Sequence, residues 1–169
     1  MRTQTQALPL SLTSHKTYLW AALFVAGNIA LPQLCHTVGL GGQAFLPILF
    51  FTLIAAARYG VVCGLVTAVA SPLVNHLMFG MPDAGMLALT VAKSVALALV
   101  IGLAVQKTGK LTLTAGVAGI AAYQIVGIAL VAATTGTLAT AWSAALLSWP
   151  AMAIQVIAIL VLLQLPNRK

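Results

Sequence analysis

Long apolar runs separated by short polar stretches dominate the chain and predict a bundle of six transmembrane helices. A helix that crosses a bilayer needs about 20 predominantly apolar residues. The predicted helices cover residues 17–34, 44–57, 60–79, 86–105, 113–133 and 142–163. The second is short, because at about 1.5 Å per residue it covers only about 20 Å of a hydrocarbon core roughly 30 Å thick. We therefore expect a concavity beside it, completed by the loop that precedes it.

The composition supports an all-α integral membrane protein. Hydrophobic residues make up 62% of the 169 residues and charged residues only 5%, whereas about a quarter of a soluble domain is charged. The net charge of +7 would suggest nucleic acid in a soluble protein. Here the basic residues fall singly between apolar runs, without a basic face, so we expect no nucleic-acid partner.

The basic residues also predict an orientation in the membrane. Lys and Arg collect in short cytoplasmic loops, and the segments 35–43, 80–85 and 134–141 contain neither. Seven of the eight basic residues lie in the alternate segments, namely Arg2, Lys16, Arg58, Lys107, Lys110, Arg168 and Lys169. Both termini are then cytoplasmic, and we expect a multi-pass protein of the cell (inner, cytoplasmic) membrane. Its parts are a tail over 1–16, a bundle over 17–165 and a basic tail over 166–169.

Lys93 is the eighth basic residue and lies inside the predicted fourth helix. An ammonium at the centre of a membrane helix costs roughly 2.5–3.5 kcal/mol on insertion scales, so an interaction must offset it. The chain has one acid, Asp83, in a predicted loop. Three interpretations stay open: an anionic ligand meets Lys93, the loop folds back to pair Asp83 with it, or the lysine snorkels or is neutral.

Further polar side chains gather at the same predicted ends of helices. Asn75 and His76 are adjacent in the third helix, and three more residues flank the first loop: Gln33, His36 and Gln43. A metal site needs three or more ligands, and no carboxylate stands nearby. We therefore expect no metal and no bound cofactor. Hydrogen bonding to a ligand or to loop backbone is the preferred interpretation.

Two amides and one tryptophan lie deeper in the predicted membrane. Gln124 and Gln155 either line the floor of a cavity or link helices, for about 0.6 kcal/mol each. Trp149, directly before Pro150, could stack on a planar ligand. With Asp83 as the only acid, the chain lacks the paired groups that general acid–base hydrolysis requires. We expect no enzymatic activity.

Several short motifs give the chain a resemblance to a known family. They are Leu31-Pro32 through His36, Phe45-Leu46-Pro47, Tyr59-Gly60 with Gly64, Ser71-Pro72 leading to Gly80-Met81-Pro82, and Pro150 followed by Gln155. Between about residues 22 and 165 the chain resembles the substrate-binding S component of energy-coupling factor (ECF) transporters, the vitamin importers of prokaryotes.

The resemblance implies a function and a set of partners. An S component binds a vitamin-like small molecule at the outer face and delivers it by toppling against a transmembrane coupling subunit. ATP is hydrolysed by two separate ATPase subunits. The repeat of Ala22, Ala26 and Ala30 matches the alanine motif that docks on the coupling subunit. Lys93 departs from the pattern, because related sequences often have a glutamate there; together with the electrostatic argument, this favours an anionic ligand.

Two rival functions come from other classes. A stand-alone facilitator or small channel would transport its substrate without an ATPase partner. A membrane-embedded enzyme would use His36 and His76, but the shortage of acids disfavours it.

Overall fold

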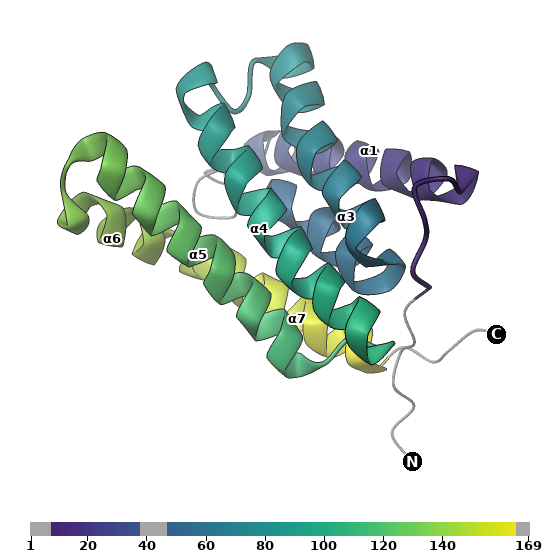
Figure 1. Cartoon of the computed structure of the whole chain (residues 1–169). Helices are drawn as coiled ribbons and strands as arrows, with labels where there is room; N and C mark the ends of the chain where they lie inside the picture. The colour runs from purple at the N-terminus through teal and green to yellow at the C-terminus, as the bar shows by residue number, and fades with distance from the viewer. Residues whose placement is uncertain (1–7, 38–46, 165–169) are drawn as a thin grey trace.

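The computed structural model describes residues 8–37 and 47–164, which are helical apart from their turns (Figure 1). The helical elements lie side by side, and from η1 onward they are joined by short turns, as the spacing of the apolar runs predicts. In chain order they are α1 (His15–Thr37), the 3-10 turn η1 (Pro47–Leu49), α3 (Phe50–Phe79), α4 (Ala84–Thr108), α5 (Leu113–Thr135), α6 (Leu138–Leu147) and α7 (Trp149–Gln164).

α3 is a helical hairpin, because the chain turns back at Gly60. This residue has φ 84° and ψ −174°, a combination essentially restricted to glycine. The two arms touch closely: a Cβ built on Gly64 would lie 2.8 Å from the Cβ of Ala56. The arms correspond to the predicted helices 44–57 and 60–79, although residues 44–46 lie outside the described part of the chain.

A buried polar cluster fixes the hairpin to α1. The Asn28 amide donates to the hydroxyls of Thr52 (3.0 Å) and Ser71 (2.9 Å), one on each arm. Its carbonyl oxygen accepts from the Phe51 amide at 3.0 Å, so it satisfies one of the free N–H groups at the start of α3. Thr52 and Ser71 lie on opposite sides of the Gly60 turn and yet contact the same side chain, so the two arms run antiparallel. Asn28 thus acts as a link between helices.

The segment before α1 donates hydrogen bonds to backbone carbonyls at the Gly60 turn of the hairpin. The amides of Leu8 and Leu10 donate to the carbonyls of Arg58 (2.8 Å) and Tyr59 (3.0 Å). These carbonyls end the first arm and have no partner within their own helix. In lipid an unsatisfied backbone group costs several kcal/mol, so the described part of the N-terminal tail is a structural element of the Gly60 corner.

The bundle continues through α4 and α5, which form a second antiparallel hairpin (Figure 1). Both helices begin at a residue whose side chain accepts a backbone N–H: Asp83 caps α4 and Thr112 caps α5. α4 also packs on the second arm of α3, and Gly102 leaves room for Val61 to approach. The centre of the core consists of side chains with no exposed surface, among them Leu53, Leu97, Ile101, Tyr123 and Ile159.

The prediction of a single last helix over residues 142–163 is wrong. The chain forms α6 and α7, and their axes differ by 49° across Ser148. The break precedes Pro150, which has no N–H to donate and disfavours helical geometry in the residue before it. The Ser148 amide instead donates to the Ala145 carbonyl at 3.2 Å, which tightens the end of α6.

The described helices give fewer spans than predicted. By length and composition alone, four elements could cross a membrane (α1, α3 taken with both arms, α4 and α5), and the bent pair α6–α7 makes a fifth if it counts as one span. The expected six included the first arm of α3, which is too short to cross alone. An all-helical, multi-pass membrane protein is therefore confirmed in its coarse form.

Apart from Lys93, the fold collects the lysines and the arginine of the described chain at one end. Arg58 lies beside the Gly60 corner, and Lys107 and Lys110 flank the turn between α4 and α5. Lys16 joins them, because the neighbouring Thr17 carbonyl contacts the Cys63 thiol just past that corner. Asp83 lies at the opposite end, in the turn between α3 and α4. We call these the basic end and the acidic end.

We expect Gly60→Ala to destabilise the fold by about 1–3 kcal/mol, because an L-residue is strained at this φ and ψ. Its Cβ would also lie 3.3 Å from Pro9. Thermal unfolding of the purified protein measures the loss. Gly136→Ala is the comparison, because Gly136 also has a positive φ (71°) but open space around it. Its loss measures the cost of a left-handed backbone alone and should be smaller than that of Gly60→Ala. Equal losses in the two variants would contradict a special role for the corner.

Candidate functional site

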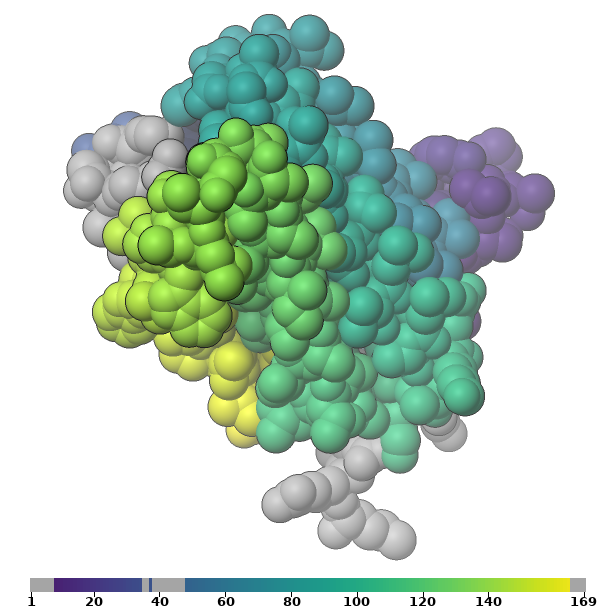
Figure 2. All heavy atoms as spheres, turned by 60° about the vertical axis from the view of Figure 1, so that its left-hand side comes forward, coloured from purple at the N-terminus to yellow at the C-terminus, as the bar shows by residue number. Residues whose placement is uncertain are grey.

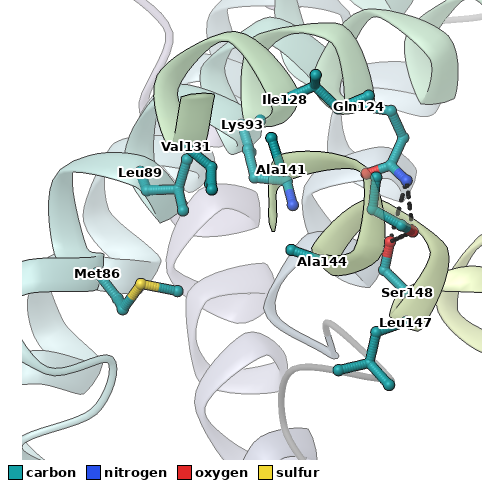
Figure 3. A pocket seen from close by; sticks show the side chains of 12 residues that line it. Met86, Leu89, Lys93, Gln124, Ile128, Val131, Ala141, Ala144, Leu147 and Ser148 are labelled. Carbon is teal, nitrogen blue, oxygen red and sulfur yellow. Dashed lines mark hydrogen bonds between the residues drawn. The ribbon is translucent and has the colours of Figure 1, made fainter. Parts of the chain in front are cut away.

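A cavity of about 80 Å³ lies between α4, α5 and α6, in the half of the bundle toward the acidic end (Figure 3). Figure 2 looks toward this side of the molecule, where the turn between α5 and α6 stands forward. Most of the lining is apolar, and three side chains bring polar groups. The lining residues are Met86, Leu89, Lys93, Gln124, Gly127, Ile128, Val131, Ala141, Ala144, Ala145, Leu147 and Ser148.

Lys93 extends from α4 across α5 and carries its ammonium into this cavity (Figure 3). Its path depends on Gly127, because a Cβ built there would lie 3.0 Å from Cε and 3.3 Å from Nζ of Lys93. The ammonium lies over the Tyr123 ring, 5.5 Å from the ring centroid. The side chain is directed toward the neighbouring helix, which disfavours the snorkelling interpretation.

No carboxylate in the described chain pairs with Lys93. Asp83 accepts the Met86 amide at 3.0 Å and begins α4. Lys93 follows ten residues later, about 15 Å along the helix axis. A cation–π contact contributes about 0.5–2 kcal/mol, which offsets only part of the roughly 2.5–3.5 kcal/mol cost of the charge. In its charged form Lys93 therefore still requires an anion or strong hydrogen-bond acceptors.

Gln124 forms the opposite side of the cavity and connects it to the break between α6 and α7. Its amide nitrogen donates to the Ala145 carbonyl (3.2 Å) and the Ser148 hydroxyl (3.0 Å), and it lies 3.4 Å from the Met152 sulfur. Its amide oxygen is buried and has no hydrogen-bond partner in the described chain. Gln124 is therefore both a link between helices and a lining residue, the two roles expected of it as alternatives.

Three other predicted site residues are buried outside this cavity. Asn75 and Gln155 are each 2% exposed, and Gln33 is partly buried. Each has one buried polar atom with no partner among the described residues, namely Asn75 Oδ1, Gln155 Oε1 and Gln33 Nε2. The structure does not bring them to the cavity that holds Lys93.

The remaining predicted site residues have different surroundings. His76 hydrogen-bonds through Nδ1 to the Pro82 carbonyl at 2.6 Å; a carbonyl only accepts, so Nδ1 carries the proton. This bond closes the turn between α3 and α4. Trp149 is 66% exposed at the start of α7. The side chain of His36 and all of Gln43 lie outside what the structure describes.

The sequence analysis did not identify two residues of the site. Gly127 makes space for Lys93, and Ser148 contributes a hydroxyl group. Gly127 lies among many small residues of α5, so only its contact with Lys93 reveals its role. Ser148 could have been identified from the sequence, because it lies two residues before Pro150 and helices often break before a proline.

The site has few polar groups. Its described residues offer one cation, one amide and one hydroxyl, and no group of three His, Cys, Asp or Glu in the described chain could hold a metal ion. Pockets for whole small-molecule ligands measure about 300–1,000 Å³. A cavity of about 80 Å³ has room for one end group of such a ligand or for a very small molecule.

Comparison with known proteins gives no relative: no family model, curated protein or solved structure matches the chain.

We expect His76→Leu to lower stability by about 1 kcal/mol, because it leaves the Pro82 carbonyl without its donor. For a chain of this length, that corresponds to a fall in Tm of about 2–4 °C. Thermal unfolding tests this, with Leu77→Ala at the exposed neighbouring position as the control. If His76→Leu were as stable as the parent, the hydrogen bond would not contribute to the turn.

Proposed function

We propose that this protein captures a small anionic molecule, or the anionic end of a larger vitamin-like molecule, in the membrane for import. In this proposal it serves as the S component of an ECF-type importer. A transmembrane coupling subunit and two ATPase subunits provide the energy, and the protein itself has no enzymatic activity.

The observation that carries the proposal is the position of Lys93. A positively charged side chain in a membrane helix marks a functional site by default, because its insertion is costly. Here it lines a cavity, the only acid of the chain caps a helix, and the Tyr123 ring offsets part of the cost. An anionic ligand would supply the missing interaction. A purely structural helix would be more stable with an apolar residue at this position.

The distribution of charge supports an entry from outside the cell. Under the positive-inside rule the basic end faces the cytoplasm, so the cavity lies in the outer half of the membrane. A ligand would then arrive at the acidic end, where Asp83 is the only charged residue of the turn that follows α3. This orientation is the one expected of an S component.

The alanine repeat of α1 supports the proposed coupling partner. Ala22, Ala26 and Ala30 are all exposed in the folded chain. Small residues at intervals of four allow a second helix to approach closely in a membrane. The repeat is therefore free to receive a helix of a coupling subunit.

Mass spectrometry of small molecules released from the gently purified protein tests the capture function. We expect an anionic compound in the parent protein, and its loss from Lys93→Met, because methionine keeps most of the volume and removes the charge. Lys107→Met is the matched control, since Lys107 is exposed at the basic end. It should retain the compound.

The proposal would be contradicted if Lys93→Met released the same anion in the same amount as the parent. If neither protein released a compound, vesicle uptake without an ATPase partner would separate capture from a stand-alone facilitator.

We expect Ala26→Leu to abolish ATP-driven uptake in vesicles that contain the partner subunits, while the bound compound is retained. The larger side chain would prevent the close approach of a coupling helix. Ala121→Leu, at an exposed position of α5, is the control and should transport normally. Full uptake by Ala26→Leu would contradict the assignment of this surface.

A further inference from the structure

The Gln124 side chain carries information about the ligand, because its surroundings fix which way the amide points. Its terminal nitrogen and oxygen differ in what they can bind: NH₂ donates and the oxygen accepts. One end contacts the Ala145 carbonyl and the Ser148 hydroxyl. The other end is turned toward the cavity (Figure 3).

Only one of the two orientations satisfies these contacts. The Ala145 carbonyl can only accept, so the end of Gln124 beside it must be the NH₂ group. The Ser148 hydroxyl donates its own proton to the same carbonyl at 2.7 Å, which leaves it to accept from Gln124. The reversed amide would place two oxygens against each other. Oε1 must therefore face the cavity side.

Lys93 and Gln124 are close enough for one small molecule to meet both. The Lys93 ammonium lies beside Gly127, which follows Gln124 by three residues on α5. Residues three apart on a helix are neighbours, with Cβ atoms about 5–6 Å apart. Both side chains line the same cavity of about 80 Å³.

The two groups have complementary requirements. The ammonium needs an anionic acceptor, since the described chain gives it no carboxylate. Gln124 Oε1 needs a donor, because it is buried without one. A buried acceptor left without a donor is unfavourable. If Lys93 rotated toward Gln124, its ammonium would donate to Oε1, but the positive charge would still have no anion beside it.

We infer that the cavity selects an anion that carries a hydrogen-bond donor beside its charge, such as a 2-hydroxycarboxylate or an acid with a neighbouring N–H. The anionic oxygens meet Lys93, and the adjacent O–H or N–H donates to Gln124 Oε1. This deepens the proposed function and rests on it, since it assumes that Lys93 binds an anion.

Three small probes separate the two requirements. Lactate carries a carboxylate and a neighbouring hydroxyl, propionate carries the carboxylate alone, and lactamide is neutral. Each is titrated into the full-length protein, and dissociation constants are obtained from the rise in Tm with ligand concentration. We expect lactate to bind about two- to tenfold more tightly than propionate, the range for one hydrogen bond. Lactamide should not bind measurably.

Two variants assign the preference to its residues. In Gln124→Met the ratio of lactate to propionate affinity should fall to about one, because sulfur is a weak acceptor. The ratio is measured within one variant, so a change in overall stability does not affect it. Gln155→Met is the matched control, since Gln155 is a buried amide outside the cavity. It should retain the preference for lactate.

The possible results distinguish this inference from the function it rests on. Equal binding of lactate and propionate by the parent, or a preserved preference in Gln124→Met, would overturn the inference and leave the anion site intact. If neither acid bound, or if both bound equally well to Lys93→Met, the anion site itself would be refuted.

Discussion

A single ammonium inside an almost acid-free bundle is the constraint on which this account depends. The chain places Lys93 in a transmembrane helix, makes space for it with Gly127 and provides the Tyr123 ring beneath it. These contacts offset only part of the cost of the charge. The only acid is used to begin α4. The bundle therefore holds a cation in a cavity whose natural complement is an anion.

The helices begin, turn or break at three places inside the bundle, and the exposed backbone groups at each place have their own hydrogen-bond partners. Backbone groups cannot remain unsatisfied in lipid. At the Gly60 corner the segment before α1 supplies the donors, and at the start of α3 Asn28 supplies an acceptor. At the break between α6 and α7 the Ser148 amide and hydroxyl donate to the Ala145 carbonyl, and the Gln124 amide adds a further donor from α5. This hydrogen bond leaves the amide oxygen of Gln124 on the cavity side. The same side chain therefore links α5 to the break and contributes to the proposed site.

The lengths of the apolar runs predicted most helices of the described chain. The breaks in helices and the contacts between side chains could be seen only in the folded structure. The helices around Lys93 and the turn at residues 80–83 lie where expected, because long apolar runs and capping residues are local signals. The bend at Ser148 was missed, although Pro150 marks it. Lys93 and Gln124 were both candidates, but only the pairing of α4 with α5 brings them to the same cavity. Asn75, Gln155 and Trp149 were equally plausible by sequence, and packing places them elsewhere.

The most direct test of anion binding at Lys93 is anomalous X-ray scattering from the full-length protein crystallised with 2-bromopropionate, which carries a carboxylate beside a strongly scattering bromine atom. We expect an anomalous peak in the cavity between α4, α5 and α6, with the carboxylate against the Lys93 ammonium. The same experiment on Lys93→Met should show no peak there. Bromine found only elsewhere in the parent, or found equally in the cavity of the variant, would contradict the claim that Lys93 is an anion-binding residue.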